Sequence, residues 1–175
     1  EQNRQYLHAM SAYRQSGDFD ALSRVVQEDA GILLASLPPT RVLQGLEECP
    51  VSTLKAHPLA LLVLMRSMFN WRNIPKMMEL KGLLLSAIAE DPTLPAEERG
   101  NLLGECDLIL SFLCYNDISA MSRLHRSASA QMSHPAISIR NSGGWTFGSP
   151  SVLMMFYRAP GELASELAEM DECMP

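Results

Sequence analysis

The chain has 175 residues, of which 47% are hydrophobic and 19% are charged, a composition that fits one globular domain or a stack of repeats and argues against a disordered tail. Only 6% of the residues are aromatic, whereas leucine, alanine and methionine are abundant, and this mixture favours helices over β-sheet. The net charge of −6 argues against direct binding of nucleic acid, because phosphate contacts need clustered Lys and Arg side chains.

The first part of the chain predicts a helical hairpin and a short helix. The hairpin spans about residues 3–29, and Gly17 with Asp18 supplies a flexible turn and a new N-cap between its two helices. The short helix begins at the prolines before Thr40, since proline suits a first helical turn, and it ends at Cys49-Pro50.

A second hairpin is predicted over about residues 58–89, with its turn at Asn70–Asn73. Its first helix, Leu59–Asn70, is apolar nearly all round, which is typical of a helix buried between neighbours. In its second helix one apolar side is predicted to consist of Ile74, Met77, Met78, Lys81, Leu85 and Ile88. Core packing is the favoured interpretation for Met65, Met68, Met77 and Met78, and a ligand groove is the alternative.

A third hairpin is predicted over about residues 96–132, followed by a long loop at 133–149 and two closing helices within 151–173. Because a hairpin of two helices cannot bury its apolar face alone, we expect the hairpins to stack. The predicted fold is therefore all-α, a TPR-like superhelix or solenoid with a concave surface. Residues 1–175 are expected to form a single helical-repeat domain and, from the appearance of both ends, an internal fragment of a larger protein.

The cysteines and the apolar runs indicate a cytoplasmic protein outside the membrane. No CxxC spacing is present, and each cysteine lies in an apolar or helical context that suits a buried free thiol in a reducing compartment. These residues are Cys49, Cys106, Cys114 and Cys173. No apolar run reaches the roughly 20 residues that a membrane-spanning helix needs.

Two stretches of the sequence carry a family resemblance. The first runs from Leu37 through Leu43, Leu46, Leu54 and His57-Pro58-Leu59 to Asn73, and the second comprises Gly144–Leu153 (GWTFGSPSVL) and Pro160–Leu163 (PGEL). They resemble the central, tetratricopeptide-like helical region of MalT-like, LuxR-class ATP-dependent transcriptional regulators, and the range from the first to the last of them, residues 37–163, is most of the chain.

The resemblance implies a regulatory sensor or coupling segment whose partners include the ATPase and helix-turn-helix domains of the same full-length protein. Neither domain is expected here, since the chain has no GxxxxGK[ST] string and no basic recognition helix. HExxH, paired Cys/His spacing and GxSxG are absent as well, so we expect no enzyme, no metal site and no cofactor in this segment.

Candidate binding residues follow from charge and from aromatic side chains near turns. No acidic residue occurs between Asp117 and Glu162, so the arginines in this stretch could receive an anionic ligand or an acidic neighbour; a solvated surface is the alternative. An indole at a turn or in a loop could bind a ligand or cover the core. The candidates are Trp71, Arg123, Arg126, Arg140, Trp145 and Arg158.

Two functions remain open at this point. In the first, the concave surface binds an effector, and the resulting change in packing controls the other domains of a transcriptional regulator. In the second, the chain is a protein–protein interaction scaffold without a small-molecule ligand. An enclosed pocket with a few polar groups would favour a small effector, and a contiguous exposed apolar patch would favour a protein partner.

Overall fold

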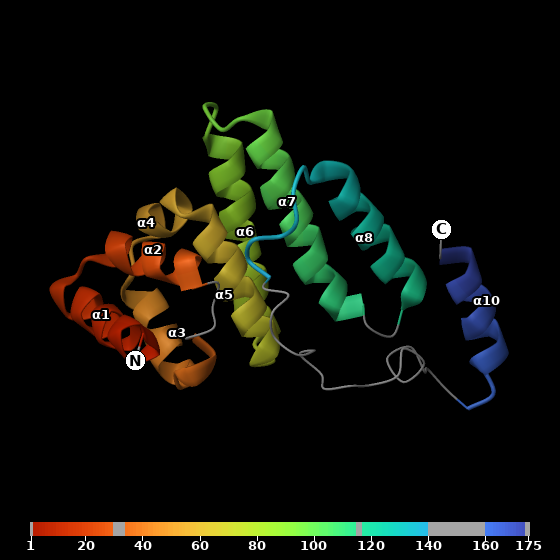
Figure 1. Ribbon diagram of the computed structural model, residues 1–175, viewed down its shortest axis with the longest axis horizontal. Coiled ribbons are helices and arrows are strands. Elements are labelled where there is room, and N and C mark those ends of the chain that lie inside the picture. The colour runs from red at the N-terminus through yellow and green to blue at the C-terminus, as the bar shows by residue number, and fades with distance from the viewer. Residues whose placement is uncertain (1, 30–33, 115–116, 140–159, 174–175) are drawn as a thin grey trace.

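The computed structural model describes residues 2–29, 34–114, 117–139 and 160–173, and within these ranges it contains helices and no strand (Figure 1). The prediction of an all-α fold is therefore confirmed. The elements are α1 (Gln2–Ser16), α2 (Phe19–Asp29), η1 (Leu34–Ser36), α3 (Pro39–Glu48), α4 (Val51–Ala56), α5 (Pro58–Asn70), α6 (Ile74–Glu90), α7 (Ala96–Ser111), η2 (Phe112–Cys114), α8 (Ile118–Gln131) and α10 (Leu163–Cys173).

The second helix of each hairpin begins after a polar residue whose side chain accepts an N-cap hydrogen bond, as predicted for Asp18. The side-chain oxygen of Asp18 accepts from the amide of Ala21 at 2.9 Å, directly after Gly17, whose φ is +73°. Two further caps repeat this geometry in α6 and α8. They are Asn73, which accepts from Lys76 N at 3.2 Å, and Asp117, which accepts from Ala120 N at 2.8 Å.

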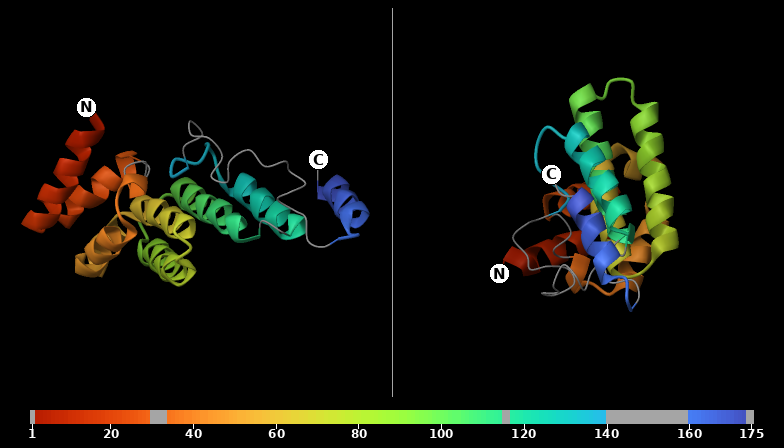
Figure 2. Two further views of the ribbon diagram at one scale, coloured as in Figure 1. Left: turned by 90° about the horizontal axis from the view of Figure 1, so that it is seen from below. Right: turned by 90° about the vertical axis from the view of Figure 1, so that its right-hand side faces the viewer.

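The helices pack as three hairpins that follow one another along the molecule. Within the hairpins α1 packs on α2, α5 on α6 and α7 on α8; between them α2 contacts α5, α5 contacts α7, and α8 contacts α10. In Figure 2, α5, α7, α8 and α10 lie side by side along the long axis, and α6 lies to one side of this row. The first and last helices, α1 and α10, are consequently at opposite ends (Figure 1).

The core is centred on α5, whose sequence is apolar on almost every side. Leu61, Leu62, Val63 and Met65 are completely buried, as expected for a helix with neighbours all round it. Of the four methionines interpreted as core residues, Met65, Met68 and Met77 are buried, whereas Met78 is 43% exposed.

The predicted apolar side of α6 was wrong in part. Met78 and Leu85 are 43% and 40% exposed, and the buried row consists of Met77, Leu80, Leu84, Ala87 and Ile88. Because apolar residues occur on more than one side of α6, two rows of its residues satisfy helical periodicity, and the contacts with α5 and α4 decide which row is buried.

Helices α7 and α8 approach closely where α7 has two glycines. A Cβ on Gly100 would lie 2.6 Å from the carbonyl oxygen of Gln131, and one on Gly104 would lie 2.4 Å from Cγ of Met132. Because the neighbour of Gly100 is a backbone atom, that position requires glycine for this packing, whereas a Cβ on Gly104 would require the Met132 side chain to move.

The segment after α8 has no regular secondary structure at 132–139, in agreement with the start of the predicted loop. It is bound to α7: Asn101 Oδ1 accepts from the amide of Ser133 at 2.7 Å, and the buried carboxylate of Glu105 accepts from the amides of Ile137 and Ser138 at 2.7 and 2.8 Å. The rest of the predicted loop, 140–149, and the predicted helix at 151–158 lie outside the described residues. The last predicted helix is present as α10.

Helix α10 lies against α8, where Glu169 Oε1 accepts a hydrogen bond from the amide of Ser119 at 3.1 Å.

Among the described helices, none combines the length and the apolar character that crossing a bilayer requires.

Candidate functional site

A groove with a volume of about 550 Å³ lies beside the first hairpin, between α1, α2, η1, α3, α4 and the start of α5. Its walls bring together residues from 10 to 64 of the sequence. Because residues three or four apart share a helix face, α2, α3 and α5 each turn a pair toward the groove. These pairs are Leu22 with Val26, Val42 with Leu46, and Ala60 with Leu64.

The buried residues that line the groove form its base and are apolar except for Ser23, whose hydroxyl donates to the carbonyl oxygen of Phe19 within α2. Leu34 is 2% exposed, Ala60 1% and Leu64 5%, and Val26 and Leu54 are buried beside them. These side chains belong to the same hydrophobic cluster as the rest of the α5 core. Burial of an apolar ligand against this base would therefore gain roughly 25 cal/mol for each Å² removed from water.

The edge of the groove is polar and contains an ion pair between α1 and α3. Arg14 donates to both carboxylate oxygens of Glu48, with distances of 2.8 Å from Nε to Oε2 and 2.8 Å from Nη2 to Oε1. Gln44 donates to Oε1 of Glu48 from Nε2 at 3.1 Å. The hydrogen bond from Arg14 is the largest cause that holds the pKa of Glu48 below its ordinary value.

Arg41 is the second cation at this edge. It is exposed, it lies in the first turn of α3, and its side chain forms no hydrogen bond or ion pair with any residue in the described ranges. The ionisable Arg and Glu side chains that line the groove are thus Arg14, Arg41 and Glu48. They make the groove locally positive in a chain whose net charge is −6.

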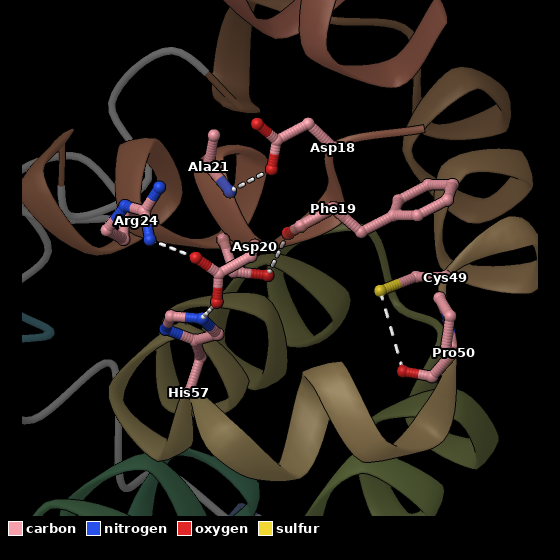
Figure 3. A network of polar contacts seen from close by, with 9 residues as sticks. Asp18, Phe19, Asp20, Ala21, Arg24, Cys49, Pro50 and His57 are labelled. Carbon is pink, nitrogen blue, oxygen red and sulfur yellow. Dashed lines mark hydrogen bonds and ion pairs between the residues drawn. The ribbon is translucent and has the colours of Figure 1, made fainter. Parts of the chain in front are cut away.

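A second polar contact joins the first hairpin to the start of α5. His57, the residue between α4 and α5, donates from Nε2 to Oδ1 of Asp20 at 2.6 Å, and Asp20 also forms an ion pair with Arg24 one turn along α2 (Figure 3). The hydrogen bond from His57 is the largest cause that lowers the pKa of Asp20. The side chain of His57 makes no cap bond to α5 and pairs with α2 instead.

The cysteines are free thiols within the described residues, but only Cys106 is buried; Cys49, Cys114 and Cys173 are half-buried, so the expectation of four buried thiols was wrong for three of them. Burial raises the pKa of the Cys106 thiol to about 11 and also raises the pKa of the Cys49 thiol. Cys49 lines the groove, and its sulfur lies near the carbonyl oxygen of Pro50 (Figure 3). Both thiols are therefore protonated at neutral pH and are poor nucleophiles.

The described part of the chain contains no group of three His, Cys, Asp or Glu side chains placed to hold a metal ion.

The candidate residues predicted from the sequence do not line the groove where the structure describes them. Trp71 lies at the C-terminal end of α5 and packs against the core, which corresponds to the core-covering interpretation. Arg123 and Arg126 are exposed on α8, and Arg126 donates to Ser122 within that helix at 2.8 Å. Arg140, Trp145 and Arg158 lie outside the described residues.

Sequence reasoning missed Arg14 and Arg41 because it searched for arginines in a stretch without acidic residues. Both of these arginines have acidic residues nearby in the sequence, and they line one groove only after folding places α1 near α3, where Arg14 pairs with Glu48. Gly45 interrupts an otherwise good helical pattern, but an isolated glycine inside a helix does not by itself indicate a site, and Gly82 interrupts α6 in the same way away from the groove.

Comparisons with known proteins give no similar protein whose binding site could be compared with the groove. No family model matches the chain, and no curated protein or solved structure matches it either. The geometry and the charge of the groove make it the candidate site.

Proposed function

We propose that this chain is a regulatory helical-repeat module, the sensor or coupling segment of a MalT-like, LuxR-class transcriptional regulator, and that the groove beside the first hairpin binds its effector. In this proposal the hairpins are the repeats of a TPR-like superhelix. The packing of α7 on α5 supports it, because first helices of successive repeats contact each other in such stacks. Its partners are the ATPase and helix-turn-helix domains of the full-length protein.

The observation that carries the proposal is the groove itself. Its volume of about 550 Å³ falls within the range of roughly 300 to 1,000 Å³ that small-molecule sites occupy. An apolar base with a few polar groups at the edge is also typical of such sites, since the base contributes affinity and the polar groups orient the ligand. This combination favours a small-molecule effector over a protein partner as the ligand of the groove.

The position of the groove gives the effector a way to act on the rest of the chain. One wall is the first hairpin, which is joined to α3 by Arg14–Glu48 and to the start of α5 by Asp20–His57. A ligand that binds more tightly to one placement of this hairpin than to another shifts the population toward that placement. The size of the regulatory effect is limited by that difference in affinity.

The test uses two glycines, each inside a helix, at which an added Cβ meets nothing within 4 Å: Gly45 lines the groove, and Gly82 is on the exposed side of α6. Leucine at either position removes a helix-interior glycine and should stabilise the helix by about 0.8 kcal/mol. Only Gly45→Leu also fills the groove. A small-molecule collection is screened by thermal unfolding against the wild type, Gly45→Leu and Gly82→Leu.

We expect at least one compound to raise the Tm of the wild type and of Gly82→Leu but not that of Gly45→Leu. Ligand at 100 times its Kd should stabilise the protein by about 2.7 kcal/mol. The proposal is wrong if no compound shifts the Tm while a fragment of the ATPase or helix-turn-helix domain does.

One observation favours the alternative of a protein–protein scaffold. The exposed side of α6 carries Met78 and Leu85, and Pro75, Gly82 and Ala89 are exposed at intervening spacings of three and four residues. This spacing is that of a helix surface that packs against another helix. If α6 is the binding surface, Leu85→Glu should abolish binding of the protein fragment and leave small-molecule binding unchanged.

A further inference from the structure

We propose that the effector of the groove is an apolar molecule with a single carboxylate, and that Arg41 binds this carboxylate. The inference rests on the proposed function, because it names the chemistry of the ligand at the same site. It follows from the charges at the edge of the groove, from the position of Arg41 in α3 and from the nature of the base.

The charges at the edge leave one cation uncompensated. Glu48 accepts two hydrogen bonds from Arg14 and one from Gln44, so its carboxylate and the Arg14 guanidinium are engaged with each other. Arg41 has no such partner within the described ranges. The groove can therefore accept one negative charge from a ligand without separating an existing ion pair.

The position of Arg41 strengthens the attraction for an anion. It lies in the first turn of α3, where the helix dipole places partial positive charge. This turn contains no acidic residue, and Pro38 at the N-cap provides no side-chain hydrogen bond to the helix amides. The potential from the helix end and the guanidinium therefore act together at this side of the groove.

One carboxylate fits this site better than a phosphate or a neutral polar group. A planar guanidinium can donate two parallel hydrogen bonds to a carboxylate. A phosphate monoester carries about 1.5 to 2 negative charges at pH 7, which is more than the single positive charge of Arg41 can compensate. A neutral group would leave the Arg41 charge without a counter-charge.

The base determines the remainder of the ligand. Leu34, Ala60 and Leu64 present hydrocarbon and no polar side-chain atom, so the part of the ligand that lies deepest must be apolar. An alkyl chain or aryl group with a terminal carboxylate satisfies both ends of the groove. Decanoate is a suitable probe, and 1-decanol is its neutral counterpart.

The experiment measures Kd values by calorimetry, below the aggregation concentration of each probe, for decanoate and 1-decanol. The proteins are the wild type, Arg41→Gln, Arg123→Gln and Gly45→Leu. Arg123 is an exposed arginine on α8, away from the groove, so its variant controls for the change in net charge. Gly45→Leu controls for the location of binding.

We expect the wild type to bind decanoate at least tenfold more tightly than 1-decanol, since a charge-assisted pair of hydrogen bonds is lost in the alcohol. Arg41→Gln should weaken decanoate binding by about tenfold or more and leave 1-decanol binding unchanged. Arg123→Gln should resemble the wild type, and Gly45→Leu should bind neither probe.

Equal affinities for decanoate and 1-decanol, both lost in Gly45→Leu, would overturn the carboxylate inference and leave the effector-binding groove intact. Decanoate binding that survives in Gly45→Leu, or that Arg41→Gln does not weaken, would also overturn the inference. If neither probe binds the wild type, the ligand chemistry is wrong, and the compound screen with Gly45→Leu and Gly82→Leu decides separately whether the groove binds an effector.

Discussion

His57 donates a hydrogen bond of 2.6 Å to the carboxylate of Asp20 and so joins the start of α5 to α2 (Figure 3). The two residues are 37 positions apart in the sequence. Arg24 approaches the same carboxylate from the next turn of α2, so Asp20 has a partner on its own helix and one on the neighbouring element. Together with Arg14–Glu48, this contact fixes the hairpin that forms one wall of the groove.

Acid should weaken this attachment. The pKa of Asp20 is lowered in the folded protein, chiefly by the hydrogen bond from His57, so folding favours its ionised form. Its contribution to stability is then complete above the ordinary carboxyl pKa of 3.8 and is lost as the pH falls through the lower folded value. In Asp20→Asn, we expect the free energy of unfolding in urea to lie below that of the wild type at pH 6, with the difference disappearing toward pH 2.

Asp171→Asn, which changes an exposed carboxylate on α10, is the matched control and should follow the wild type throughout. A difference between Asp20→Asn and the wild type that stays constant from pH 6 to pH 2 would show that the carboxylate charge is not responsible.

The segment 132–139 should depend on Glu105. Glu105 is 2% exposed, and its carboxylate accepts two backbone hydrogen bonds, from Ile137 and Ser138. In Glu105→Gln, one of the two amides would face an NH₂ group, and an unsatisfied buried donor costs about 1 to 3 kcal/mol. We expect the free energy of unfolding of Glu105→Gln to be lower than that of the wild type by this amount. We also expect the amides of residues 137 and 138 to exchange hydrogen faster in the variant.

Glu98→Gln on the exposed side of α7 provides the comparison for this variant and should change neither quantity. If the exchange of residues 137 and 138 is the same in Glu105→Gln and in the wild type, Glu105 does not hold the segment.

The elements that could be predicted from the sequence are those whose hydrogen bonds are local. Asp18, Asn73 and Asp117 cap helices within three residues of their own positions, so the sequence around each turn contains the complete interaction. Helix α4, Val51–Ala56, was not predicted, because six residues between two prolines are too few to show a helical period.

The groove could not be predicted in the same way. It needs α1, α3 and α5 to converge, and the pairing of Arg14 with Glu48 spans 34 positions. Apolar periodicity predicts that each helix has a buried side and does not say where two buried sides leave a space between them. The exposed row on α6 illustrates the same limit, since Met78 and Leu85 fit a helical stripe as well as Met77 and Leu84 do.

Two adjacent leucines test that assignment on α6. Leu84 is completely buried and Leu85 is 40% exposed. Truncation of a buried leucine costs about 2 to 5 kcal/mol, whereas a surface substitution usually changes stability by less than about 0.5 kcal/mol. Chemical denaturation of Leu84→Ala and Leu85→Ala should therefore separate the two variants clearly. Equal losses would mean that both rows of α6 are buried.

Two glycines make the corresponding test of the contact between α7 and α8. In Gly100→Ala the new Cβ would lie 2.6 Å from a backbone oxygen, Gln131 O, and because a backbone atom cannot rotate away, α8 itself would have to shift. Overpacking of this kind costs about 1 to 3 kcal/mol, which exceeds the gain of about 0.8 to 1 kcal/mol from removing a helix-interior glycine. Gly82→Ala makes the same chemical change in open space, so only the gain remains. Thermal and urea unfolding should show Gly100→Ala less stable and Gly82→Ala more stable than the wild type; stabilisation by both would mean that α7 and α8 do not approach closely at Gly100.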